Sequence, residues 1–125
     1  MGDITKNYII NTSSNNVFKA LTEIEAISEW SGDDAEMNLE PNGTFSLWGG
    51  SIHGVNVKIS QDQIIQKWKE DSWEEFSKVT FNLKARGKQT EVELIHQGIP
   101  DQSVMSIDNG WDEYYMLPLK EFVEQ

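Results

Sequence analysis

Apolar and polar residues alternate with a period of two along most of the chain, which predicts a protein built largely from β-strands. Near the N-terminus, the alternation over Ile4–Ile10 predicts a first strand. Between residues 37 and 97 the same alternation recurs in short runs separated by turn signals such as Pro41-Asn42-Gly43. Short alternating runs joined by tight turns are typical of antiparallel strands that follow one another along the chain.

The strand around Phe81 shows the alternation most clearly. Its apolar positions are Val79, Phe81, Leu83 and Ala85. The residues between them are polar, so one face of the predicted sheet meets water. On the next strand one face carries Val92, Leu94 and His96, and on an earlier strand a similar alternation carries His53, Val55, Val57 and Ile59.

Helical spacing appears in two places. After the possible N-caps at residues 12–14, apolar residues recur in a way that predicts two short helices with a break near Thr22: Val17, Phe18, Leu21, Ile24, Ile27 and Trp30. At the C-terminus, steps of three and four residues place Ile107, Trp111, Tyr115, Leu119 and Phe122 on one stripe of a long helix. Pro118 removes one backbone donor from this helix, so we expect a bend there.

The predicted order is strand, two short helices, about six antiparallel strands and a long terminal helix. A sheet with one apolar face needs a cover, and the terminal helix is the only long amphipathic element available. We therefore expect a single α+β domain over residues 1–125, in which a curved antiparallel sheet of about six to seven strands wraps around the C-terminal helix.

Charge and composition limit the partners and cofactors that can be expected. Ten basic and 21 acidic residues give a net charge of -11, which repels phosphate backbones and anionic bilayers, so neither nucleic acid nor a membrane is expected as a partner. The chain has no cysteine, no basic-apolar leader and no run of about 18 apolar residues, which favours a cytoplasmic protein. The acidic loop with Asp33, Asp34 and Glu36 lacks the ligand spacing of a calcium loop, so no metal or other cofactor is expected.

Four landmarks along the chain resemble a known family in their order and spacing. They are Asn42–Gly54 (NGTFSLWGGSIHG), Ile64–Trp73 (IIQKWKEDSW), Thr90–Pro100 (TEVELIHQGIP) and Asn109–Phe122 (NGWDEYYMLPLKEF). Together they resemble the C-terminal domain of the Aha-type activators of the heat-shock protein 90 ATPase, within the START-like (SRPBCC) superfamily. The resemblance implies a helix-grip fold and a non-enzymatic, co-chaperone-like binding module of the stress response, with a heat-shock protein 90 type chaperone as its partner.

The superfamily resemblance also implies an alternative, because its members include binders of small hydrophobic ligands and a few cyclases. A ligand would then occupy a cavity between the terminal helix and the sheet. The candidate pocket residues are Phe81, Leu83, Leu94, His96, Trp111, Tyr115 and Leu119.

Three residues have two interpretations each. His96 lies on an apolar strand face, where it is either a satisfied core-edge histidine or a base, as in weak cyclase-like chemistry; His53 has the same two interpretations. Trp73 either shields a sheet edge or contacts a partner, since Trp is enriched among interface anchors.

Overall fold

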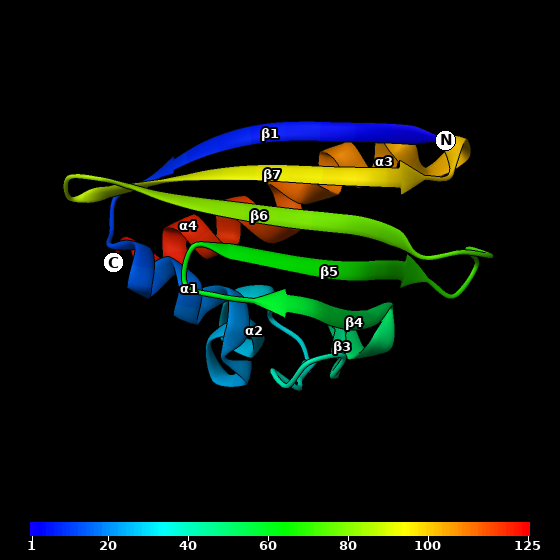
Figure 1. Cartoon of the computed structure of the whole chain (residues 1–125), viewed down its shortest axis with the longest axis horizontal. Helices are drawn as coiled ribbons and strands as arrows, with labels where there is room; N and C mark the ends of the chain where they lie inside the picture. Colours follow the sequence, from blue (N-terminus) through cyan, green and yellow to red (C-terminus); the bar gives the residue numbers. More distant parts are fainter.

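The computed structural model describes all of residues 1–125 and confirms an α+β fold in which one curved antiparallel sheet holds a long C-terminal helix (Figure 1). The strands are β1 (Gly2–Ile10), β2 (Glu36–Met37), β3 (Thr44–Leu47), β4 (Ile52–Ile59), β5 (Gln63–Glu70), β6 (Ser77–Arg86) and β7 (Gln89–Ile99). The helices are α1 (Ser14–Thr22), α2 (Ile24–Ser31), α3 (Val104–Gly110) and α4 (Leu117–Val123), with the 3₁₀ turns η1 (Trp48–Gly50) and η2 (Asp101–Ser103) and the π-helical segment η3 (Trp111–Met116).

The seven strands form one sheet in the order β1-β7-β6-β5-β4-β3-β2. Six of them follow one another as a meander, and β1 pairs with β7, so the first and last strands of the chain are neighbours. All helices lie on one side of this sheet, and the other side is uncovered (Figure 1). The predicted order of elements is confirmed.

The two short helices break where the sequence predicts. Ser13 caps α1, because its side chain accepts a hydrogen bond from the backbone N–H of Asn16. Glu23 then adopts an extended conformation that separates α1 from α2, and Gly32 ends α2 in the left-handed region with a φ of 74°. Trp30 ties the pair together by donating its indole N–H to the carbonyl of Ala20 at 2.9 Å.

The terminal helix runs through α3, η3 and α4 and widens into a π turn in its middle. In this turn the N–H of Leu117 bonds the carbonyl of Asp112, five residues back. Repeated steps of four residues drift around a helix of 3.6 residues per turn, and the wider turn offsets that drift for the stripe of Trp111, Tyr115 and Leu119. Pro118 follows directly after the π turn, at the start of α4. No helix in the structure is long and apolar enough to cross a bilayer.

A polar cluster fastens the π turn to β1. Tyr8 donates to Asp112 at 2.6 Å and Lys6 donates to the same carboxylate at 2.9 Å, with Asp108 at 3.3 Å from the lysine. The hydrogen bonds from Tyr8 and Lys6 lower the pKa of Asp112, so the carboxylate stays ionised at neutral pH. These contacts hold the terminal helix against β1, the edge strand of the sheet.

His53 does not lie on the core-facing side of β4, as its interpretation as a core-edge residue would require. His53 points to the outer face of the sheet, where its Nε2 lies 2.8 Å from a carboxylate oxygen of Asp71. The inward positions of β4 are instead Ile52, Gly54 and Asn56, all buried. Asn56 is satisfied in the interior by hydrogen bonds to the carbonyl of Asn38 and from the side chain of Gln66, which is why a polar residue can face the core.

Candidate functional site

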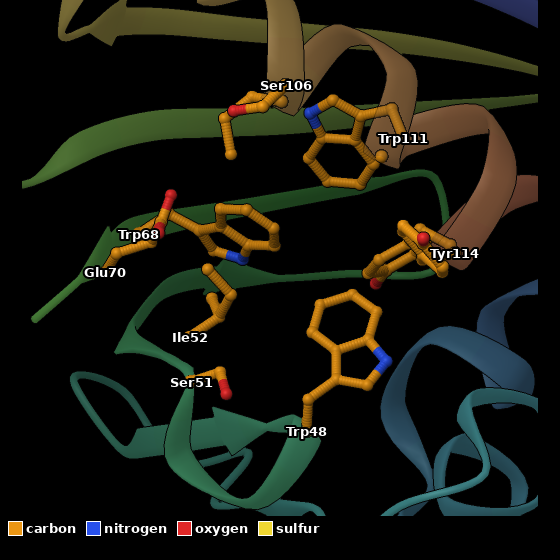
Figure 2. Close-up of a pocket in the computed structure, with 11 residues that line it drawn as sticks. Trp48, Ser51, Ile52, Trp68, Glu70, Ser106, Trp111 and Tyr114 are labelled. Carbon is orange, nitrogen blue, oxygen red and sulfur yellow. The ribbon is translucent and has the colours of Figure 1, made fainter. Parts of the chain in front are cut away.

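A cleft with a volume of about 380 Å³ opens at one end of the terminal helix, between that helix and the turn after β3. Figure 2 shows Trp48 and Ile52 on one side of it, Trp68 and Glu70 on another, and Ser106, Trp111 and Tyr114 of the helix opposite. We call it the aromatic cleft. Its lining residues are Trp48, Ser51, Ile52, Trp68, Glu70, Ser106, Ile107, Gly110, Trp111, Tyr114 and Tyr115.

Trp48 reaches the cleft from a strained turn. Its φ is 51°, and Gly49 and Gly50 follow with φ of 66° and 100°. A bulky residue rarely adopts the left-handed region, and such strain is concentrated at functional positions. The carbonyl of Asp34 holds the turn by accepting from the N–H of Gly49 at 3.0 Å. The turn thus brings the Trp48 ring to 6.1 Å from the Tyr115 ring, centroid to centroid.

The inner wall of the cleft is a packed aromatic stack. The rings of Trp68 and Trp111 lie 4.9 Å apart and nearly parallel, and Tyr115 lies 4.7 Å from Trp111. Phe81 closes the stack from the sheet at 5.8 Å from both Trp111 and Tyr115. Burial raises the pKa of Tyr115 well above its ordinary value, so the wall carries no charge at neutral pH.

A hydrogen-bonded chain behind the stack holds Trp111 in place. Trp111 donates to Nδ1 of His96 at 3.0 Å, and because an indole N–H only donates, Nδ1 must accept. The proton of the neutral imidazole therefore sits on Nε2, which donates to the hydroxyl of Ser77 at 2.7 Å. Ser77 donates in turn to the carbonyl of Trp68 at 2.7 Å. Burial lowers the pKa of His96 to about 4, so this chain contains a neutral histidine at physiological pH.

One donor in the cleft wall has no partner. The indole Nε1 of Trp68 is buried and forms no hydrogen bond. A buried N–H without an acceptor is unfavourable, so an acceptor that reached this atom would gain a hydrogen bond. The polar groups at the cleft are Ser51, Glu70 and Ser106, and the remaining lining is mostly apolar.

Comparison with known proteins identifies the family. The family model described as Activator of Hsp90 ATPase homolog 1-like protein matches residues 11–124. The chain belongs to this family. A Dictyostelium discoideum protein, the activator of 90 kDa heat shock protein ATPase homolog, is 35% identical over 99 residues, which cover 76% of this chain and 25% of that protein. The human homolog 1 is 24% identical over 121 residues, covering 94% of this chain and 36% of that protein. The chain therefore spans about a quarter to a third of the length of these relatives.

Solved structures of the same fold have lengths closer to that of this chain. The crystal structure of an HSP90 activator from Plasmodium falciparum matches with a TM-score of 0.92 and 26% identity, covering 97% of this chain and 95% of that one. The Aha1 dimer from Colwellia psychrerythraea matches with a TM-score of 0.84 and 20% identity. The resemblance seen in the sequence landmarks, to an Aha-type START-like domain, is confirmed.

In this chain, the predicted pocket residues separate into two groups. Trp111 and Tyr115 line the aromatic cleft. The others lie in the core behind it, each at most 6% exposed, and do not line the cleft: Phe81, Leu83, Leu94, His96 and Leu119. These buried side chains fill the space under the middle of the helix, and the cleft lies at the end near α3 and η1.

Trp73, proposed from the sequence as a partner contact, is 4% exposed and therefore offers no surface to a partner. Its indole donates to the hydroxyl of Ser103 at 3.2 Å, which fastens the β5–β6 connection to the end of η2. The sequence reasoning missed Trp48 and Tyr114 as cleft residues. The signal for Trp48 was available, because a tryptophan followed by two glycines marks a turn with left-handed backbone.

Proposed function

We propose that the chain is a non-enzymatic binding module that docks on an Hsp90-type chaperone and stimulates its ATPase. The observation that carries this proposal is the match of the family model over residues 11–124. The Plasmodium falciparum HSP90 activator adds support, because this domain covers 95% of that chain. A single domain of about this length is therefore described as an HSP90 activator.

The chemistry of the interior supports a role in binding. Both ring nitrogens of His96 are occupied, one accepting from Trp111 and one donating to Ser77. A general base needs a free nitrogen within reach of its substrate, which this histidine does not offer. His53, the other histidine, lies on the outer face of the sheet beside Asp71.

Adding the chain to a purified Hsp90-type chaperone is expected to increase ATP turnover severalfold in a saturable way. The measurement is steady-state phosphate release, with binding followed by calorimetry. The chain alone should release no phosphate, and a specific inhibitor of the chaperone should abolish the signal. The absence of both binding and stimulation at concentrations up to roughly 100 μM would contradict the proposal, because even weak transient complexes form in that range.

The aromatic cleft supports a second candidate function, the binding of a small planar apolar ligand. Its volume of about 380 Å³ lies within the range of ligand sites, which begins at roughly 300 Å³. A ring that enters between Trp48 and the stack would meet aromatic faces, and an acceptor on it would suit the unpaired N–H of Trp68.

Trp48→Gly is expected to weaken binding of the probe 8-anilinonaphthalene-1-sulfonate about tenfold, because the ring that closes the cleft is lost. Glycine suits the left-handed backbone at this position, so the variant should keep its fold. Probe fluorescence gives the affinity and circular dichroism checks the fold. Leu39→Ala, which removes an exposed apolar side chain outside the cleft, serves as control; equal weakening by both variants would argue against the cleft as the site.

A further inference from the structure

The sheet has an outer face on the side away from the helices (Figure 1). Residues of this face line a groove. It lies over β4, β5 and β6 and encloses about 410 Å³. We call it the basic groove and define it by Val57, Ile65, Lys67, Phe76 and Lys78. Phe76 and Val57 are 46% and 43% exposed, so the sheet presents an aromatic and an aliphatic side chain to water next to two lysines.

Basic residues are concentrated on the three strands that carry the groove. Strands β4, β5 and β6 contain six of the ten basic residues of the chain and one of its 21 acidic residues. The rest of the chain is correspondingly more acidic than the net charge of -11 indicates. An acidic partner is repelled by the acidic remainder of the chain and attracted to the basic residues of these strands, which favours docking at the groove.

The two lysines of the groove oppose each other without compensation. Lys67 and Lys78 are directly paired across β5 and β6, both are exposed, and neither forms an ion pair. Like charges at opposite positions of neighbouring strands destabilise a sheet. Elsewhere on the same sheet, Arg86 is paired with Glu91, so the chain does neutralise some of its strand charges. A feature that weakens the free protein with no compensating contact is typical of a binding site.

We infer that the basic groove binds an acidic protein segment that carries an aromatic or aliphatic side chain. Carboxylates of the segment pair with Lys67 and Lys78, and its apolar side chain packs on Val57, Ile65 and Phe76. The inference rests on the proposed function and deepens it, because it names the surface and the kind of chaperone segment through which the domain docks. Glu75, at the edge of the groove, limits the acidic contacts to the lysine side.

The test compares two variants of the full chain with equal net charge. Lys67→Glu with Lys78→Glu reverses the groove, and Lys19→Glu with Lys88→Glu reverses two exposed lysines outside it. The groove variant retains like charges at the paired positions, so its stability should be close to that of the wild type. We expect the groove variant to bind the chaperone about tenfold more weakly than the control variant. Equal affinity of the two variants for the chaperone would overturn the inference and leave the proposed function intact.

If the wild-type chain does not bind the chaperone, the proposed function fails, and a second probe decides the inference by itself. The probe is a ten-residue peptide of glutamates with two phenylalanines, titrated into isotopically labelled protein to about 1 mM while amide resonances are followed. Shifts that concentrate at Ile65, Lys67, Phe76 and Lys78 and vanish in the groove variant support the groove. Absent or dispersed shifts overturn it. A third outcome would also overturn the inference: sedimentation shows a dimer of the wild-type chain, the groove substitutions but not the control substitutions convert it to a monomer, and the peptide does not bind. The groove would then be an interface with a second copy of the chain.

Discussion

Lowering the pH from about 6.5 to 4 is expected to reduce the free energy of unfolding by about 3 kcal/mol through His96 alone. In the folded chain, burial lowers the pKa of this histidine to about 4 from an ordinary value of 6.5. The unfolded chain therefore binds more protons than the folded chain between these two values, and stability falls as the pH falls. Below pH 4 the folded form is protonated as well, and the contribution is exhausted.

The geometry of the site gives this prediction its structural reason. Protonation would place a hydrogen on Nδ1, which accepts from Trp111, so two N–H groups would face each other across 3.0 Å. Trp111 belongs to the stack with Trp68 and Tyr115, and its displacement would open the inner wall of the aromatic cleft. Acid should therefore loosen the terminal helix at the cleft.

Denaturant unfolding at several pH values measures the effect. In His96→Gln the dependence between pH 6.5 and 4 should largely disappear, because glutamine can still accept and donate but does not titrate in this range. His53→Gln, which removes the exposed histidine, should retain it. The lowered pKa values of Asp112 and Glu124 add a loss that begins near their ordinary values of 3.8 and 4.5, at the acid end of this range. An unchanged slope in His96→Gln would show that another group is responsible.

Strands β6 and β7 and the terminal helix follow the sequence closely, and the reason is physical. Each presents one apolar stripe, and a sheet or helix with one apolar stripe has one favourable way to pack. The inward residues Val79, Phe81, Val92 and Leu94 are at most 1% exposed, as the alternation predicts. Their spacing alone determines which face is buried.

The buried face of β4 could not be predicted in this way, because the alternating set that looks apolar in the sequence is the set that faces outward. The apolar set that begins at His53 and Val55 faces outward, and the buried positions hold Gly54 and Asn56. Glycine has no side chain to score as apolar, and Asn56 is tolerated inside only because Asn38 and Gln66 complete its hydrogen bonds. Such partners come from distant positions that periodicity does not reveal.

The candidate site was also predictable only in part, because it too depends on residues that are distant in the sequence. Trp111 and Tyr115 follow from the helical stripe, but their neighbours at the cleft depend on the strained turn that brings Trp48 toward the helix. Likewise, the basic groove depends on the register that sets Lys67 opposite Lys78. A sequence shows two lysines eleven positions apart, and only the pairing of β5 with β6 makes them adjacent.

Gly54→Ala is expected to destabilise the chain by about 3 kcal/mol or more, with a fall in Tm of roughly 10 °C. A Cβ at this position would lie 1.8 Å from the backbone carbonyl oxygen of Lys67 and 2.9 Å from the ring of Phe45. A backbone oxygen cannot turn aside as a flexible side chain can, so β4 would have to separate from β5. Because these two strands supply Ile52 and Trp68 to the aromatic cleft and Val57 and Lys67 to the basic groove, both sites should be lost together.

Gly110→Ala is the matched control, since it adds the same methyl group where there is room for it. Gly110 has helical backbone angles, with φ -64° and ψ -34°, and its added Cβ would meet no other residue closer than 3.9 Å. Alanine in a helix is favoured over glycine by about 0.5–1 kcal/mol, so this variant should be slightly more stable than the wild type. Thermal melts of both variants give the comparison. A Gly54→Ala variant that melts with the wild type would mean that β4 and β5 are less closely apposed than the structure requires.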